Sequence, residues 1–133
     1  MITKNDIAIK YIDFLEKGDM DNLLKLFSEN SIVDSPVYGI LNVKEFYTKL
    51  NNDTLNSELN LKGIFEENNL NKIAIYFNFK WKLINNKHVD FDVVDIIEFN
   101  DSNKISSLNI IYVTIKYNDV VHELCNETQH NNT

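Results

Sequence analysis

The sequence VDFDVVDIIEF, residues 89–99, guides our interpretation of the whole chain because it alternates apolar and polar side chains as a β-strand does. Its odd-numbered row consists of Val89, Phe91, Val93, Asp95, Ile97 and Phe99. One carboxylic acid therefore stands in an otherwise apolar row. Burying an isolated carboxylate is costly, so such an acid must find a partner, stay protonated or take part in chemistry. We predict that Asp95 lies in a pocket.

Length, charge and composition narrow the possible functions. The 133 residues fit one domain, which we place at residues 1–118, followed by a flexible tail at residues 119–133. The net charge of −7 argues against an anionic partner, and the chain has no arginine, on which phosphate clamps and base readout depend. We therefore expect no nucleic-acid partner. The polar N-terminus and the lack of a membrane-spanning apolar run predict a cytoplasmic protein with no membrane association.

Apolar residues at helical spacing predict three helices in the first part of the chain. The first begins at a capping box that includes Thr3 and ends at Gly18. A second, short helix is predicted from Asp19 to about residue 29, and a third begins at Asn42. Between the last two, a short strand ends before the single proline. In that strand Ile32 and Asp34 share a face, which we predict to be the inner one.

From residue 56 the apolar period changes to two, which indicates a sheet made of successive antiparallel strands. Asn85-Asn86 is typical of a two-residue hairpin turn, because both residues tolerate a positive φ. The final strand, residues 105–117, has apolar side chains on both faces, which favours a second buried surface and hence a homodimer. We predict an α+β fold in which a curved, mixed, mostly antiparallel sheet wraps the three N-terminal helices. Such a half-open cone has a lined interior where a ligand can bind.

Four polar residues fall on otherwise apolar faces: Tyr11, Asp34, Tyr47 and Asp95. Each also has a purely structural explanation. The tyrosines can be core aromatics with their hydroxyl groups at the edge, Asp34 can be a turn acid before Ser35-Pro36, and Asp95 can bond a backbone amide.

The segments around these residues resemble the ketosteroid isomerases of the NTF2-like, SnoaL-like superfamily. The likeness lies in residues 11–19, 26–34, Gly39, Phe46-Tyr47 and 92–99, and extends over about residues 7–115. It implies the NTF2-like cone fold and a proton transfer beside a ketone. By this resemblance Asp34 is the general base, Tyr11 and a protonated Asp95 form the oxyanion hole, and Tyr47 hydrogen-bonds behind Tyr11. A carboxylic acid held neutral at pH 7 is a known device of this family.

The resemblance also implies a pocket formed with Phe27, Val93, Ile97 and Tyr112. Phe27 occupies a position where some isomerases extend the tyrosine network, so a smaller network is expected here. The segment from Asp34 to Gly39 is shorter than the corresponding isomerase loop.

Three readings of function remain open at this point. The first is a steroid isomerase-like enzyme acting on a small, apolar, ketone-bearing ligand, and the second is a SnoaL-like cyclase that uses an acid as base. The third is a non-catalytic module that binds an apolar ligand or supports dimerisation. The sequence shows no metal-ligand spacing and no phosphate-binding glycine loop, so we expect no cofactor and no metal.

Overall fold

The computed structural model describes residues 2–68 and 71–112. Its elements, in chain order, are α1 (Lys4–Lys17), α2 (Met20–Leu24), β1 (Phe27–Ser35), β2 (Gly39–Asn42), α3 (Val43–Asn52), β3 (Thr54–Glu66), β4 (Lys72–Leu83), β5 (His88–Phe99) and β6 (Ile105–Tyr112). The predicted domain limit at residue 118 and the predicted tail lie outside the described residues.

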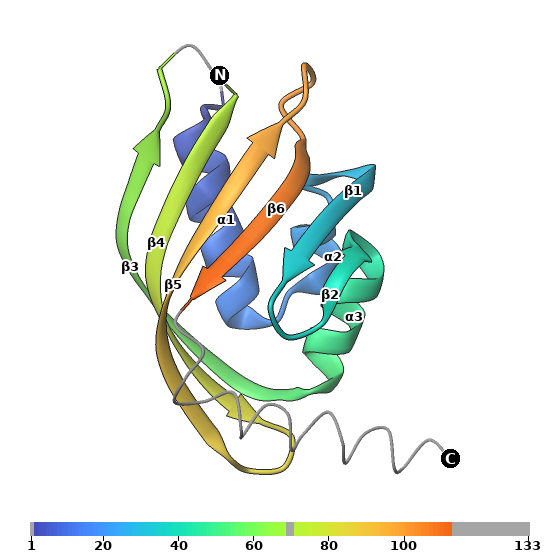
Figure 1. Ribbon diagram of the computed structural model, residues 1–133, viewed down its shortest axis with the longest axis vertical. Helices are drawn as coiled ribbons and strands as arrows, with labels where there is room; N and C mark the ends of the chain where they lie inside the picture. Colours follow the sequence, from blue (N-terminus) through green and yellow to red (C-terminus); the bar gives the residue numbers. More distant parts are fainter. Residues whose placement is uncertain (1, 69–70, 113–133) are drawn as a thin grey trace.

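Six strands form one curved sheet in the order β2-β1-β6-β5-β4-β3, and α1 crosses its inner face (Figure 1). All neighbouring strands are antiparallel except β1 and β6, which are parallel. The predicted α+β class, with three helices and a mixed, mostly antiparallel sheet, is confirmed. None of the helices that the structure describes has the length and apolar composition needed to cross a bilayer.

Local signals explain where the helices begin and end. Thr3 and Asp6 form the predicted capping box, and Gly18 ends α1 in the left-handed region at φ 70°. The side chain of Asn42 caps α3 by accepting from the Lys44 amide at 2.9 Å. The second helix is shorter than predicted because it ends at Leu24, and Phe27 already belongs to β1.

The long strands hold the predicted alternation. In β5, Val93, Asp95 and Ile97 are buried on the inner face, where they meet the side chains of the helices. Asn85 and Asn86 lie between β4 and β5 as expected, but only Asn86 has a positive φ, at 69°. The turn covers residues 84–87 and is longer than the predicted two-residue hairpin.

Candidate functional site

Asp95 lies on the inner face of β5 with 1% of its surface exposed. Its neighbours across the sheet are Ile75 on β4 and Ile110 on β6, so its surroundings are apolar on both sides. This burial raises the pKa of Asp95 to about 7, although a hydrogen bond from Tyr11 opposes the increase. Both the neutral acid and the carboxylate of Asp95 are therefore accessible near neutral pH.

The helices supply two tyrosines to this carboxyl group. The Tyr11 hydroxyl of α1 donates to Oδ2 of Asp95 at 3.3 Å, and it also lies 2.7 Å from the Tyr47 hydroxyl of α3. Burial is the main cause that holds the pKa of both tyrosines well above 10, and the nearby Asp95 adds to it. Both phenols are therefore neutral donors at physiological pH. When Asp95 is ionised, Tyr47 can donate to Tyr11, which donates to Asp95.

Packing of aromatic rings fixes the positions of both tyrosines. The Phe27 ring lies 6.2 Å from the Tyr11 ring and 5.7 Å from the Tyr47 ring, and Phe46 meets Tyr47 edge-on at 4.8 Å. Contacts of this kind restrict ring orientation and stabilise the core. The predicted hydrogen bond between Tyr47 and Tyr11 is therefore present and is held by a rigid frame.

Oδ1 of Asp95 is the open position of this network. It is buried and has no hydrogen-bond partner among the described residues. A buried polar atom without a partner costs free energy, and such atoms are uncommon in folded proteins. A ligand that offers a hydrogen-bonding group to Oδ1 would remove this cost.

Asp95 opens onto a cavity between the inner face of the sheet and the helices. The centres of water-sized spheres can occupy about 50 Å³ of this cavity. Most of its wall is aromatic and consists of Tyr11, Tyr38, Phe46, Tyr47, Phe77, Phe79, Trp81, Phe91 and Tyr112. Among the described residues that line it, Asp95 is the single side chain of the Asp, Glu, His or Lys type. The cavity therefore combines a mostly apolar wall with one carboxyl group among the described residues that line it, as small-molecule sites commonly do.

Asp34 does not line this cavity, so the predicted placement of the general base is wrong. On β1, Val33 and Ser35 point inward, whereas Ile32 and Asp34 are exposed on the outer face of the sheet. Apolar residues stand on both faces of β1 at Ile32 and Val33, and the structure buries Val33, so judging the inner face from Ile32 gave the wrong face. Ser35 takes the inward position that we assigned to Asp34.

Phe27 and Ile97 were also predicted to line the pocket, and neither does. Both are buried, but they pack behind the site in the hydrophobic core. Val93 and Tyr112 do line the cavity, as predicted. Ser35, Tyr38 and the aromatic residues of β4 also line the cavity, and the sequence did not lead us to predict them. The inward row of β4, which contains Phe77, Phe79 and Trp81, was visible as an apolar stripe but carried no signal for a cavity.

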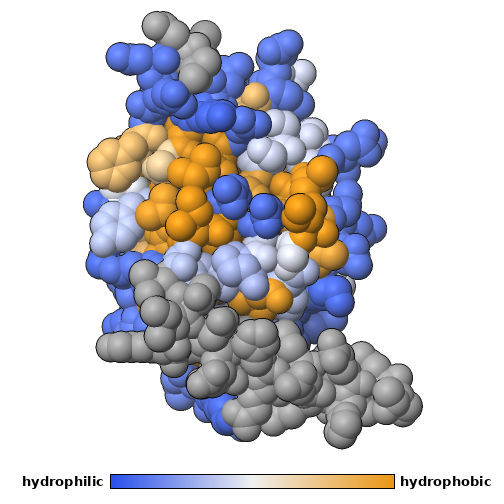
Figure 2. All heavy atoms as spheres, viewed as in Figure 1, coloured by the Kyte–Doolittle hydropathy of each residue, from blue (hydrophilic) through white to orange (hydrophobic). Residues whose placement is uncertain are grey.

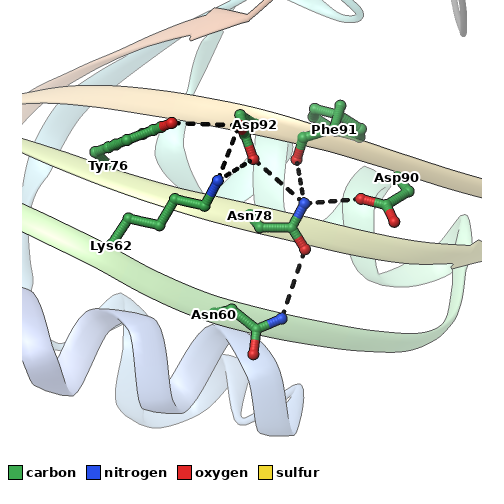
Figure 3. Close-up of polar contacts among 7 residues, drawn as sticks. All are labelled: Asn60, Lys62, Tyr76, Asn78, Asp90, Phe91 and Asp92. Carbon is green, nitrogen blue, oxygen red and sulfur yellow. Dashed lines mark hydrogen bonds and ion pairs between the residues drawn. The ribbon is translucent and has the colours of Figure 1, made fainter.

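The outer face of β5 carries a different kind of acid. Asp92 is bound by the Lys62 amine at 3.0 Å and by the Tyr76 hydroxyl at 3.3 Å, within a cluster of polar side chains that crosses β3, β4 and β5 (Figure 3). The hydrogen bond from Lys62 lowers the pKa of Asp92. The polar groups drawn there bind one another. Within residues 2–68 and 71–112, no group of three or more His, Cys, Asp or Glu side chains could hold a metal ion.

The chain resembles known proteins in its three-dimensional structure. No family model and no curated protein matches the sequence. Among solved structures, the epoxide hydrolase/cyclase-like enzyme SalBIII of pyran ring formation in salinomycin aligns with a TM-score of 0.73 at 18% identity. That alignment covers 83% of this chain and 90% of SalBIII.

Two further structures align comparably well. A protein of Shewanella putrefaciens CN-32 described as a SnoaL-like polyketide cyclase has a TM-score of 0.70 at 15% identity, covering 90% of this chain and 85% of that one. A Catenulispora acidiphila protein with a ketosteroid isomerase-like fold, crystallised with trimethylamine, has a TM-score of 0.71 at 9% identity, covering 83% and 87%. At these identities the likeness concerns the fold alone. This chain has the NTF2-like α+β cone fold shared by SnoaL-like and ketosteroid isomerase-like proteins.

Proposed function

We propose that the cavity binds a small, apolar, ketone-bearing compound and that Asp95 and Tyr11 catalyse proton transfer at the carbon beside its carbonyl. The observation that carries this proposal is the pairing of the Tyr11 hydroxyl with a buried carboxyl group whose Oδ1 atom has no hydrogen-bond partner within residues 2–68 and 71–112. A proton beside a carbonyl leaves readily only when donors stabilise the oxygen as it gains negative charge. Tyr11 is such a donor, and Tyr47 supports it from behind.

The position of Asp34 changes the division of roles that the isomerase resemblance implied. Because Asp34 lies on the outer face, Asp95 is the carboxyl group available to accept the proton. In this scheme the ionised Asp95 takes the proton, the C–H electron pair forms the C=C bond of an enolate, the C=O π pair moves to the oxygen, and that oxygen accepts a hydrogen bond from Tyr11. Because the Tyr11 hydroxyl carries one proton, it gives up its hydrogen bond to Asp95 when it donates to the ligand. Return of the proton to a different carbon completes an isomerisation. In a cyclisation, the enolate carbon instead attacks a second carbonyl carbon, and the oxygen of that carbonyl takes the proton from Asp95.

The pKa of Asp95, about 7, suits this dual role. A catalytic acid or base is most effective when its pKa lies near the working pH, because it must both take and return the proton. We therefore expect the rate to rise with pH up to about 7, where the Asp95 carboxylate becomes the main form, and then to level off.

A minimal substrate tests the proposal. The compound 3-cyclohexen-1-one is a small β,γ-unsaturated ketone whose isomerisation gives a conjugated enone with ultraviolet absorbance, and in D₂O its exchange of α-protons reports enolisation by NMR. We expect Asp95→Asn to lower the rate by about 10² to 10⁴-fold, as for loss of a general base. Tyr11→Phe should lower it by about 10² to 10³-fold, as for loss of one oxyanion donor.

Asp34→Asn is the matched control because it makes the same chemical change on the opposite face of the sheet. We expect it to leave the rate unchanged. A large loss in Asp34→Asn with none in Asp95→Asn would contradict the proposed roles. The same cavity supports a second function, because an apolar cavity with one buried carboxyl group among its described lining residues is also compatible with a module that only binds its ligand. Binding of the ketone without proton exchange would favour that module.

The outer face of the sheet supports a homodimer as partner. Phe65, Ala74 and Ile96 are in register across β3, β4 and β5, and Ile32 and Ile111 are about half exposed on the same face. In the space-filling view, apolar side chains gather over the middle of the sheet (Figure 2). Exposed apolar patches of this kind mark interaction sites. Light scattering should show a dimer that Ile111→Glu converts to monomer, whereas a monomeric wild-type protein would contradict this proposal.

A further inference from the structure

The turn between β1 and β2 forms part of the cavity wall. Residues 36–38 connect the two strands, and Val37 and Tyr38 line the cavity. The Ser35 hydroxyl accepts from the Val37 amide at 3.1 Å and from the Tyr38 amide at 3.4 Å, which shapes the turn. The other described lining residues belong to helices or strands, whereas Val37 and Tyr38 lie outside the regular hydrogen bonding of both.

Tyr38 attaches the turn to the end of α3. Its hydroxyl donates to Oδ2 of Asp53 at 2.5 Å, and its ring meets the Phe46 ring edge-on at 5.7 Å. Asp53 is well anchored, because it is 8% exposed, its amide donates to the Lys49 carbonyl and its carbonyl accepts from the Ile84 amide. Hydrogen bonds to charged acceptors are short and strong. The contact between Tyr38 and Asp53 therefore latches a turn onto a rigid corner of the fold.

The size of the cavity gives this latch a consequence. An engineered cavity of about 150 Å³ in another protein binds benzene, whereas the cavity beside Asp95 has about 50 Å³ on the same scale. A six-membered ring can reach Asp95 only if part of the wall moves. The strand walls are held by their ladders and the helical walls by the aromatic frame around Tyr47. Movement of the turn leaves both the ladders and this frame intact.

We infer that Tyr38 determines which ligands enter the cavity: its ring limits the size of the ligand, and its hydrogen bond to Asp53 opposes opening of the turn. This inference rests on the proposed function only in requiring that the cavity binds a ligand. The ligand class is then an apolar ketone with a single small ring, because a fused second ring would need the space that Tyr38 occupies.

Two phenols of different size test the inference without any need for turnover. Phenol and 2-naphthol each carry a hydroxyl that can meet Asp95 and Tyr11, and they differ by one fused ring. Their dissociation constants would be measured by ligand-observed NMR for the wild-type chain and for Tyr38→Phe and Tyr38→Ala. Tyr76→Phe is the matched control, because it also removes a hydrogen bond from a tyrosine to an aspartate, the one to Asp92 on the outer face.

We expect Tyr38→Phe to tighten binding of both phenols by roughly threefold to tenfold, the factor associated with one hydrogen bond that no longer has to be broken. Tyr38→Ala should tighten binding of 2-naphthol at least about tenfold more than binding of phenol, while Tyr76→Phe should change neither. Affinities that stay at the wild-type value or fall in Tyr38→Phe would overturn the latch. An equal gain for both phenols in Tyr38→Ala would overturn the size limit.

The outcomes separate this inference from the proposed reaction. Phenol binding that responds to Tyr38→Phe, together with no α-proton exchange in the ketone, would contradict the reaction and support the latch. Proton exchange with no effect of Tyr38 substitutions would do the reverse. Failure of both phenols to bind any variant would contradict the inference about Tyr38, and the reaction would then be judged by the α-proton exchange of the ketone. Since Tyr38→Ala removes a large ring from the wall, chemical denaturation should confirm that it folds, and Tyr38→Phe carries the test of the latch by itself.

Discussion

Asp92 and Asp95 lie three residues apart on β5, yet their surroundings give them opposite properties. Asp92 is exposed on the outer face and bonded to Lys62, which lowers its pKa. Asp95 is buried on the inner face, where burial raises its pKa to about 7. The same side chain therefore has its carboxylate form favoured on one face of the sheet and its neutral form favoured on the other. The strand's alternation alone decides which of the two an aspartate becomes.

The largest effect is expected on the pH dependence of the free energy of unfolding, which tests the contrast between Asp92 and Asp95. The pKa of Asp95 is higher in the folded chain than in the unfolded one, so the folded state holds this proton more tightly and its contribution to stability is greatest below about pH 4. That contribution should be lost as pH rises from about 4 to 7, by about 4 kcal/mol for an increase in pKa from 3.8 to about 7. Urea denaturation of wild type and Asp95→Asn across this range measures the loss.

In Asp95→Asn the pH-dependent loss should disappear, because the amide does not ionise. Asp92→Asn should give a smaller effect of the opposite sign. Its pKa is lowered in the folded chain, so its contribution is present above the unfolded pKa and is lost as pH falls through the folded pKa. Equal pH profiles of stability for wild type and Asp95→Asn would show that Asp95 ionises at little cost in free energy. That result would contradict the contrast between the two aspartates.

A smaller effect is expected at the tyrosines that bind the two acids. Tyr11→Phe removes a hydrogen bond from Asp95 and another from the Tyr47 hydroxyl, and both groups are buried. Leaving such groups without a partner costs about 1 to 3 kcal/mol. Because the Tyr11 hydrogen bond lowers the pKa of Asp95, the variant should also raise that pKa. Thermal unfolding and ¹³C NMR of the aspartate carboxyl groups would show both changes.

Tyr76→Phe is the comparison on the outer face, since Tyr76 donates to the exposed Asp92 and water can replace it there. We expect neither the stability nor the Asp95 titration to change. A loss comparable to that of Tyr11→Phe would mean that the two faces do not differ as described.

The smallest effect is expected for the ion pair between Lys62 and Asp92. Both side chains are more than 40% exposed, so water and salt screen their attraction. Lys62→Met should leave the melting temperature within experimental error and should move the pKa of Asp92 back toward its usual value. A clear loss of stability would indicate that the polar cluster of Figure 3 contributes more to the fold than exposed ion pairs normally do.

The alternation of the sequence allowed us to predict some residues correctly and misled us at others for definable reasons. β5 alternates over a long run with one consistent apolar row, so the inward position of Asp95 followed directly. β1 has isoleucine at 32 and valine at 33, one on each face, and a register shift precedes them. Its parity was therefore ambiguous, and Asp34 was assigned to the wrong face.

Tertiary structure decided the remaining features. Phe27 fits the helical stripe of α2 as well as it fits β1, and pairing with Ile105 on β6 makes it part of the strand. Tyr38 could not be recognised as a wall of the cavity, because its partner Asp53 lies 15 residues further along the chain and no local pattern links them. The association of Tyr11, Tyr47 and Asp95 was predicted through a family resemblance, since their spacing in sequence does not reveal it.

The parallel pairing of β1 with β6 also has a consequence for how the chain folds. Each of the strands β3 to β6 pairs with a strand next to it in sequence. In contrast, β1 pairs with β6, which lies far along the chain, through pairs such as Val33 with Leu108. Contacts that close long loops form slowly, because the chain loses the entropy of loop closure before these contacts can stabilise it. Tyr11 and Tyr47 lie in the N-terminal half of the chain, and Asp95 lies in the C-terminal half. The site is therefore complete only when the two halves have come together. The ability to bind a ligand should therefore appear late in refolding, together with the last cooperative step.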